Sequence, residues 1–309
     1  MNYLTPRKIV IITKQTRADE MIKRFNNLAQ AEFYVEKMGG EIQEYLREDQ
    51  IYKTAVSDIT NAAQALARIQ KIEREYVPNY IFGKDDIVIV VGPDGLVVNT
   101  LKYLDGQDLI AVNPDPTRYD GILLPFRKSD VTHVVREVVA KQRRSQEITM
   151  ALATLNDGQN LLAVNDFFIG RKTHVSARYN LAINGKQEDQ SSSGIIVSTG
   201  LGSSGWLKSV ITGAKGIAGN ISGQRITGSL KNQNWNSDYL YYSVREPFPS
   251  QTTGTTLVFG KITANLEITS YMPESGVIFS DGIEQDFLEF NSGIKAKISL
   301  ADKKGYLIV

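Results

Sequence analysis

Short apolar runs alternate with amphipathic segments through the first half of the chain, and this alternation constrains the fold more than any other feature. The apolar runs occupy residues 8–12, 87–91 and 109–112, and each has the length and composition of a strand that is buried on both faces. Apolar side chains recur at helical spacing in four other segments, residues 21–35, 59–72, 97–104 and 131–139. Strands that alternate with helices predict a parallel α/β sheet.

The pattern changes near residue 145. Beyond it, residues 177–183 alternate with the period of two that is typical of a strand, and Asn184-Gly185 follows as a favourable hairpin turn. The sequence therefore predicts an α/β plus β architecture, with a Rossmann-like α/β domain over residues 1–145 and a β-rich domain over residues 146–309. Further strands of the second domain are predicted over residues 195–197, 256–259, 265–268 and 277–279.

The composition narrows the possible functions. The 309 residues carry a formal net charge of +1, so no strong field favours a nucleic acid or an acidic membrane as a partner. Cysteine is absent, which excludes disulfides, thiol catalysis and cysteine-bound metals, and His133 and His174 are the only histidines. The first residues do not resemble a signal peptide and no apolar run is long enough to span a bilayer, so a cytoplasmic protein is the expectation.

The stretch Gly92-Pro93-Asp94-Gly95 follows one of the apolar runs and precedes a helical segment. A strand that leads through small residues into a helix aims backbone N–H groups and a positive helix end at one point, which suits a phosphate group. Asp94 would lie at the carboxyl end of a parallel strand, where it could accept a proton from a substrate hydroxyl or help to hold Mg²⁺. The alternative is a Pro-Asp-Gly turn that binds nothing.

Glycine and hydroxyl side chains are concentrated in residues 198–206, Ser-Thr-Gly-Leu-Gly-Ser-Ser-Gly-Trp, directly after a predicted strand. Glycine lets a backbone approach a ligand closely, and neighbouring hydroxyls can bind ribose or phosphate oxygens. A flexible Gly/Ser linker is the alternative, but linkers rarely carry a large apolar residue such as Trp206.

Two shorter polar motifs lie among apolar residues. Asn165-Asp166 interrupts an apolar run, so its side chains would need polar partners, which a ligand amide or a ribose hydroxyl could supply. Asp281-Gly282 comes directly after Ser280, at the end of a predicted strand. Taken alone, each motif is more simply explained as a turn.

These four motifs occur in the order, and at about the spacing, that is found in NAD kinases, and the likeness covers almost the whole chain. In that family a strand leads into Gly-Gly-Asp-Gly-Thr, followed by Asn-Glu or Asn-Asp, then by Thr-Gly-Ser-Thr-Ala-Tyr, then by Asp-Gly. The segments VIITKQTR, AVNPDPTRYDGILLPFR, SARYNLAING and YSVREPF resemble the animal mitochondrial branch most closely.

The resemblance implies a two-domain fold in which the second domain supplies much of the dinucleotide site and the final segment often returns to the first domain. It implies phosphorylation of the adenosine ribose 2′-hydroxyl of NAD to give NADP, with Mg²⁺ as cofactor and ATP or polyphosphate as donor. NAD and a nucleoside triphosphate would be the partners, and members of the family are usually homodimers or homotetramers.

The resemblance also implies roles for individual residues. Asp94 matches the aspartate thought to activate the 2′-hydroxyl, and Gly92 and Gly95 match glycines near the phosphates. Lys14, Thr16 and Arg17 resemble a Lys-x-Thr-Arg element of the mitochondrial branch, in which Lys14 and Arg17 carry the charge that suits phosphate. The residues implied to contact NAD or to line its pocket are Asn165, Asp166, Thr199, Gly202, Ser203, Ser204, Gly205 and Trp206.

Two residues depart from the family pattern on the side of the phosphoryl donor. Pro93 replaces a glycine and has no backbone N–H, and Leu96 replaces a threonine and has no hydroxyl. Two alternatives therefore stand beside an NAD kinase: a non-catalytic protein that binds NAD or NADP, and a related kinase that acts on a sugar or a lipid. The motifs around Asn165 and Trp206 argue against the second alternative. The sequence identifies no metal ligand beyond Asp94.

Overall fold

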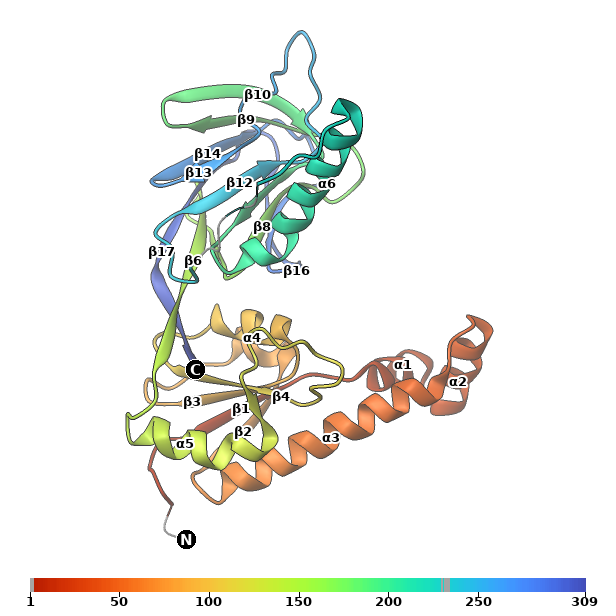
Figure 1. Cartoon of the computed structure of the whole chain (residues 1–309), viewed down its shortest axis with the longest axis vertical. Coiled ribbons are helices and arrows are strands. Elements are labelled where there is room, and N and C mark those ends of the chain that lie inside the picture. The colour runs from red at the N-terminus through yellow and green to blue at the C-terminus, as the bar shows by residue number, and fades with distance from the viewer. Residues whose placement is uncertain (1–2, 229, 231–233) are drawn as a thin grey trace. The chain divides into compact units, whose positions relative to one another are not determined.

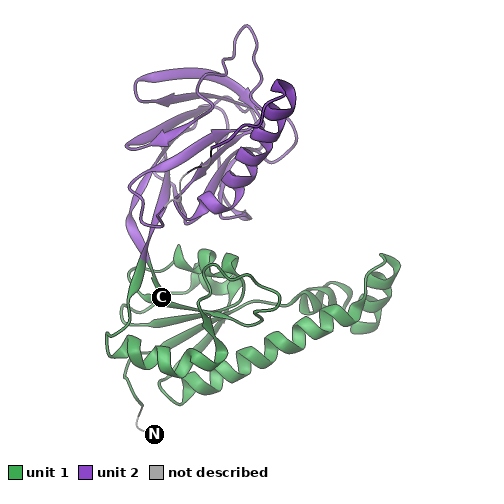
Figure 2. Cartoon of the chain, viewed as in Figure 1, with its two compact units in different colours: residues 1–146, 306–309 green, residues 147–305 purple. Residues whose placement is uncertain are grey.

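The computed structural model of the chain describes residues 3–228, 230 and 234–309. The chain divides into two compact units (Figure 2): unit 1 comprises residues 1–146 and 306–309, and unit 2 comprises residues 147–305. The chain passes from unit 1 to unit 2 within strand β6 (Ser145–Leu155) and back to unit 1 within strand β17 (Lys295–Ile308).

A parallel sheet forms the centre of unit 1, in the order β2-β1-β3-β4. The final residues of the chain extend it, because Tyr306 and Leu307 of β17 pair in parallel with Asp108 and Leu109 of β4. Every residue of β1 and β3 is buried, as expected for strands covered on both faces. The strands are β1 (Ile9–Thr13), β2 (Ile69–Glu73), β3 (Ile87–Val91), β4 (Asp108–Asn113) and the short β5 (Phe126–Arg127), which pairs with β4.

Helices cover both faces of this sheet (Figure 1). Helices α3 (Ile42–Gln64) and α5 (Val131–Val139) lie on one face, and α4 (Asp94–Leu101) lies on the other. Two shorter helices, α1 (Arg17–Phe25) and α2 (Leu28–Lys37), lie beside the N-terminal end of α3. The 3-10 helices η1 (Arg74–Asn79) and η2 (Lys128–Asp130) complete the elements of unit 1 within the described residues.

Two of the predicted helices of unit 1 are wrong in their bounds. The helix predicted over residues 21–35 is broken into α1 and α2, because Asn26 adopts the left-handed region with φ 65° and the Asn27 side chain caps α2. The helix predicted over residues 59–72 begins earlier, at Ile42, and ends at Gln64. Its last apolar positions belong to β2, where Ile69 pairs with Ile9 of β1, so strand pairing overrides a helical spacing.

Unit 2 is built from two antiparallel sheets. One contains β10-β9-β14-β17, with β6 and β7 attached through β17, and the other has the order β13-β12-β11-β8-β15-β16. Phe167 and Tyr179, one from each sheet, are fully buried in a core that both sheets share. The strands are β7 (Asn160–Ala163), β8 (Asp166–Arg171), β9 (Ala177–Ile183), β10 (Lys186–Ser192), β11 (Ile195–Ser198), β12 (Leu240–Val244), β13 (Phe259–Ile262), β14 (Asn265–Ser270), β15 (Gly276–Ser280) and β16 (Ile283–Glu289).

The strands predicted for unit 2 are confirmed apart from one displacement, but β6, β7, β8, β12, β16, β17 and one helix were not predicted. The hairpin at Asn184-Gly185 is confirmed, since both residues have the positive φ of such a turn, 51° and 74°. The strand predicted over residues 256–259 begins only at Phe259, where pairing with β12 sets its register. Helix α6 (Trp206–Ser222), which follows the 3-10 helix η3 (Gly202–Ser204), was not predicted, because its several glycines disfavour a helix. In the part of the chain that the structure describes, no helix has the length and apolar character needed to cross a membrane.

Candidate functional site

The Gly92–Gly95 loop joins β3 to α4, as the sequence predicts. Pro93 is the N-cap of α4 and has an extended backbone, φ −74° and ψ 167°, which the proline ring readily adopts. Asp94 is the first helical residue, and Gly95 is exposed beside it. The first N–H groups of a helix have no intrahelical acceptor, so this loop presents backbone donors and a positive helix end at the carboxyl edge of the sheet.

Gly92 and Leu96 are explained by packing against each other. Leu96 is 3% exposed, and a Cβ added at residue 92 would lie only 2.7 Å from Leu96 Cδ2. A glycine at position 92 therefore makes room for the leucine that replaces the threonine of the family pattern. Gly95 is different, because no atom lies within 4 Å of the place where its Cβ would be. Contacts with the described residues therefore do not require a glycine at position 95.

The Asp94 carboxylate is held in place by the loop that follows β4. Its Oδ1 accepts a hydrogen bond of 2.8 Å from the backbone N–H of Leu123. Asn113, at the end of β4, also holds this loop in place. Its Nδ2 donates a hydrogen bond to Tyr119 O at 3.1 Å, and its Oδ1 accepts one from Asp115 N–H at 3.0 Å. Oδ2 of Asp94 forms no hydrogen bond with the residues that the structure describes. Asp94 thus has one oriented oxygen and one that is available.

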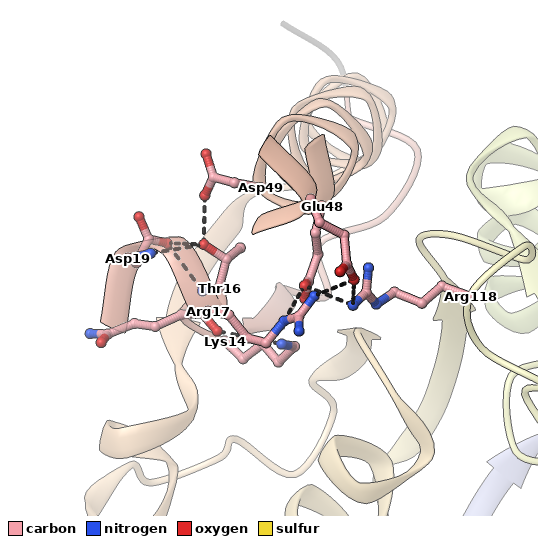
Figure 3. Close-up of polar contacts among 9 residues, drawn as sticks. Lys14, Thr16, Arg17, Asp19, Glu48, Asp49 and Arg118 are labelled. Carbon is pink, nitrogen blue, oxygen red and sulfur yellow. Dashed lines mark hydrogen bonds and ion pairs between the residues drawn. The ribbon is translucent and has the colours of Figure 1, made fainter. Parts of the chain in front are cut away.

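The basic element after β1 contains two cations with different partners (Figure 3). Arg17 is paired with carboxylates on α3, its Nε lying 2.6 Å from Glu48 Oε2 and its Nη2 lying 3.1 Å from Glu44 Oε1. Arg118, from the loop after β4, approaches the same two carboxylates at 3.2 Å each. Glu48 is 7% exposed, so the two guanidinium groups compensate a buried charge. Arg17 therefore has a structural role, the pairing with Glu44 and Glu48, in addition to the phosphate binding that the sequence predicts.

Lys14 keeps a charge that no carboxylate of the described residues neutralises. Within residues 3–228, 230 and 234–309, its ammonium group has no carboxylate within 4.0 Å and only a long hydrogen bond, 3.5 Å, to Gln15 O. The ammonium nitrogen lies 5.7 Å from the centre of the Tyr52 ring. Thr16 is not free to bind phosphate in the same way, because it caps α1 and its hydroxyl lies 2.6 Å from Asp49 Oδ1. Of this element, Lys14 is the residue best suited to an anion.

Asp281 joins two of the motifs of unit 2. Its carboxylate accepts hydrogen bonds from the backbone N–H groups of Val164, Asn165 and Asp166, at distances of 2.7 to 3.3 Å. Asp281 itself has φ 54°, in the left-handed region, and Gly282 follows with φ 71°. The Asp281-Gly282 motif is therefore more than a turn, because it fixes the backbone of the Asn165-Asp166 motif.

Thr199 joins the third motif to the same place. Its hydroxyl donates to Val164 O at 2.6 Å and accepts from Gly202 N–H at 3.1 Å, while its backbone N–H donates to Asn165 O at 2.9 Å. A Cβ at Gly202 would lie 2.1 Å from Asn165 O, closer than any real contact. This glycine is needed for two backbone segments to touch, so the alternative of a flexible linker is wrong.

Replacing Gly202 with alanine is expected to destabilise unit 2 by roughly 3 kcal/mol or more, because the clash lies with backbone rather than with a movable side chain. Gly213→Ala is the matched control. It lies inside α6 with nothing within 4 Å of its Cβ, so it should raise stability slightly by favouring the helix. Chemical denaturation of both variants measures the difference, and a G202A protein as stable as the wild type would contradict the close approach.

The remaining residues of the third motif are engaged within the chain. Ser203 Oγ donates to Gly200 O at 2.7 Å and Ser204 Oγ donates to Leu201 O at 3.2 Å. Gly205 is the N-cap of α6, with φ −98° and ψ −118°. Trp206 stacks on Phe168, with ring centres 5.8 Å apart and planes at 11°. Trp206 therefore contributes to packing, and the two hydroxyls keep only acceptor capacity for a ligand.

Asp166 is a buried carboxyl group beside a second carboxylate. It is 7% exposed, and none of the described residues donates a hydrogen bond to its side chain. Burial, and then the negative charge of Asp281, raise the pKa of Asp166 from 3.8 to about 7. The group therefore keeps its proton to near neutral pH, where it can act as a hydrogen-bond donor. Such strongly shifted carboxyl groups are concentrated at functional sites.

Asn165 combines a fixed backbone with a free side chain. Its N–H is held by Asp281 and its C=O by Thr199, but among the described residues its amide group has no hydrogen-bond partner. Asn165 is half-buried, so the amide can reach a ligand. This arrangement places an available donor and acceptor next to the carboxyl group of Asp166.

The sequence reasoning missed Tyr52 and Arg118. Arg118 lies in one of the segments that resemble the mitochondrial branch, but nothing in the sequence indicates that it shares Glu48 with Arg17. Tyr52 lies on the buried face of α3, which also carries Glu48, and its signal in the sequence is an aromatic hydroxyl on a mainly apolar stripe. The residues that the structure describes contain no group of three or more His, Asp or Glu side chains arranged to hold a metal ion.

Two solved structures share the fold of nearly the whole chain. The chain is similar to the NADH kinase of yeast, crystallised with NADH, with a TM-score of 0.61 and 14% identity over 99% of this chain and 84% of that one. It is also similar to an NAD kinase from Archaeoglobus fulgidus in complex with ATP, with a TM-score of 0.56 and 14% identity over 98% of this chain and 93% of that one. No protein-family model and no curated protein sequence matches the chain.

The chain therefore has the NAD kinase fold, an α/β domain followed by a β-rich domain, and the predicted fold class is confirmed. An identity of 14% establishes the fold alone. Function has to be argued from the residues that the fold brings together.

Proposed function

We propose that this chain is an NAD kinase, which transfers a phosphoryl group from ATP or another donor to the 2′-hydroxyl of the adenosine ribose of NAD. The observation that carries the proposal is Asp94, a carboxylate oriented by Leu123 N–H at the positive end of α4, with its second oxygen available. The two similar structures, one crystallised with NADH and the other with ATP, support both kinds of substrate.

Asp94 would act as the general base of this reaction. The free oxygen of Asp94 accepts the proton of the ribose 2′-hydroxyl. At the same time the 2′-oxygen attacks the terminal phosphorus of the donor, and the bond from that phosphorus to the leaving oxygen breaks. The α4 N-terminus and the uncompensated charge of Lys14 would stabilise the negative charge on the phosphoryl oxygens. Pro93 removes one N–H from this loop but leaves the orientation of α4 intact.

Mg²⁺ fits this site as an ion shared with the donor. Mg²⁺ in phosphoryl-transfer sites is usually held by one or two carboxylates and by the substrate phosphates. Asp94 has a single unpaired carboxylate oxygen, which the general-base role occupies, so a bound Mg²⁺ would be held mainly by the donor phosphates and would neutralise charge on them. A site made wholly of protein side chains is not needed for this chemistry.

The polar cluster of unit 2 would recognise NAD. The free amide of Asn165 and the neutral carboxyl group of Asp166 offer donors and an acceptor to ribose hydroxyls or to an amide of the dinucleotide. Asp281 and Thr199 hold these two residues in position through their backbone. This preformed cluster favours an NAD kinase over a kinase for sugars or lipids. Assembly as a homodimer or homotetramer, a cytoplasmic location and a place in the animal mitochondrial branch stay predictions.

The test is formation of NADP by the purified protein with NAD, Mg²⁺ and either ATP or polyphosphate. Turnover with one of these donors is expected. Binding of NAD without turnover would instead support the non-catalytic alternative, which the replacements Pro93 and Leu96 suggest. Faster phosphorylation of a lipid or a sugar in a substrate panel would overturn the proposal in favour of another kinase.

Replacing Gly95 with alanine gives a second test that separates binding from folding. The free space around Gly95 means that the variant should be as stable as the wild type, or slightly more stable. If phosphates approach the backbone there, the added methyl group should raise the KM for the donor by about tenfold or more. Gly92→Ala is the contrasting variant, because its Cβ meets Leu96 and should lower stability. Unchanged donor KM in G95A would remove the loop from the donor site.

A further inference from the structure

Tyr52 connects the ends of two neighbouring strands of unit 1. It lies on α3, is 6% exposed, and its hydroxyl donates a hydrogen bond of 2.9 Å to the backbone carbonyl of Val91. The same hydroxyl accepts a hydrogen bond of 2.8 Å from the backbone N–H of Lys14. Lys14 follows β1 and Val91 ends β3, so one phenol satisfies a backbone group from each.

The position of this bridge is where the two strands stop pairing. Ile12 and Val90 are the last residues of β1 and β3 that pair with each other, and the two bridged residues, Lys14 and Val91, lie just beyond them. A tyrosine hydroxyl can donate and accept at once, whereas phenylalanine can do neither. The hydroxyl thus takes the place of a direct backbone bond and holds the strand ends apart at the edge where the Gly92–Gly95 loop begins.

The bridge also determines where the charge of Lys14 lies. Its backbone is fixed by the Tyr52 hydroxyl, and its ammonium group lies 5.7 Å from the centre of the Tyr52 ring, within range of a cation–π interaction. No carboxylate among the described residues competes for this ammonium group. Tyr52 therefore interacts with the backbone and with the ammonium group of Lys14. It also binds Val91, the residue that precedes the Gly92–Gly95 loop.

We propose that Tyr52 is a positioning residue for the phosphoryl donor, which it serves by holding Lys14 beside the Gly92–Gly95 loop. The inference rests on the proposed function, because the donor phosphates are what Lys14 and this loop would bind. Tyr52 does not touch the reacting atoms, and it affects the donor only through Lys14.

Tyr52→Phe is the variant that tests the inference, since it keeps the ring and removes the hydroxyl. We expect the KM for ATP to rise by about tenfold, the effect of losing one well-placed interaction, with the KM for NAD unchanged. Tyr179→Phe is the matched control, because Tyr179 is a fully buried tyrosine of unit 2 whose hydroxyl lies 2.7 Å from Ser192 Oγ. It loses one buried hydroxyl as well and should leave the KM for ATP unchanged.

A double-mutant cycle shows whether Tyr52 acts through Lys14. Lys14→Met removes the charge, and in that background Tyr52→Phe should change the KM for ATP by less than twofold. An unchanged KM for ATP in the single variant Y52F would overturn the inference, and so would a full tenfold effect in the K14M background.

Calorimetric binding of inorganic tripolyphosphate separates this inference from the proposed function. If the wild type forms no NADP, the kinase proposal fails, but the Tyr52 variant should still bind tripolyphosphate about tenfold more weakly than the Tyr179 variant does. Equal affinities in the two variants would overturn the role of Tyr52 whether or not the wild type turns over.

Discussion

Replacing Asp94 with asparagine is expected to lower kcat for NADP formation by a factor of about 10² to 10⁴, the usual contribution of a general base. The amide oxygen of asparagine can still accept the hydrogen bond from Leu123 N–H, so the loop should keep its position. What the variant loses is the negative charge and the capacity to accept the proton of the 2′-hydroxyl. Steady-state kinetics with saturating NAD and donor measure the change, and the KM values should move far less than kcat.

Asp58→Asn is the control for that experiment. Asp58 is an exposed aspartate of α3 that pairs with Lys128 at 2.6 Å, so it matches the chemical change without touching the Gly92–Gly95 loop. Its kcat should equal that of the wild type. An Asp94→Asn protein that turns over as fast as the Asp58→Asn protein would show that the Asp94 carboxylate is not the base.

Replacing Asp166 with asparagine is expected to stabilise unit 2 at alkaline pH and to lose that advantage in acid. The pKa of Asp166 is raised from 3.8 to about 7 by burial and by Asp281, so between these values the native state retains a proton that the unfolded state has released. The free energy of unfolding of the wild type should therefore fall as the pH rises through this window, by about 1.4 kcal/mol per pH unit. Asparagine removes the ionisation, and with it this slope.

Denaturant titrations at pH 5 and pH 8 measure the effect. The advantage of Asp166→Asn over the wild type should grow by a few kcal/mol between the two conditions, at about 1.4 kcal/mol for each pH unit up to the pKa of Asp166. Asp302→Asn, an exposed aspartate of β17, is the matched control within unit 2. A difference between Asp166→Asn and the wild type that does not depend on pH would contradict the raised pKa.

The elements that the sequence predicts best are those whose pattern can be read within one continuous segment of the chain. The buried strands at Ile87–Val91 and Asp108–Asn113 and the helix at Val131–Val139 follow directly from apolar runs and helical spacing. The segment after Ile59 is harder to predict. The spacing of Ile69 fits a helix, and only its pairing with Ile9 shows that it belongs to a strand. Helix α6 is harder still to predict, because its glycines have a low helix propensity and Leu207 is its only buried residue, so it lacks a strong apolar stripe.

In the candidate site, too, some features follow from the local sequence and others depend on tertiary contacts. Asp94 and its helix follow from local sequence, because a strand, a turn and a helix lie consecutively in the chain. The hydrogen bonds that orient the site join distant segments, as with Leu123 N–H to Asp94 and Asp281 to Asn165. The pKa of Asp166 depends on burial and on Asp281, neither of which can be read from a single sequence. Sequence thus identifies the reactive groups, whereas their orientation and charge state come from tertiary contacts.

The return of the chain to unit 1 has a consequence for biosynthesis. The backbone groups of Asp108 and Leu109 find their partners in Tyr306 and Leu307, which leave the ribosome only after all of unit 2 has been made. Until then the nascent α/β unit presents part of β4 as an open strand edge, the kind of surface on which chains pair with one another and aggregate. Deletion of the last few residues would leave this edge of β4 exposed permanently. Such a deletion would therefore destabilise unit 1, although the deleted residues are the last to be synthesised.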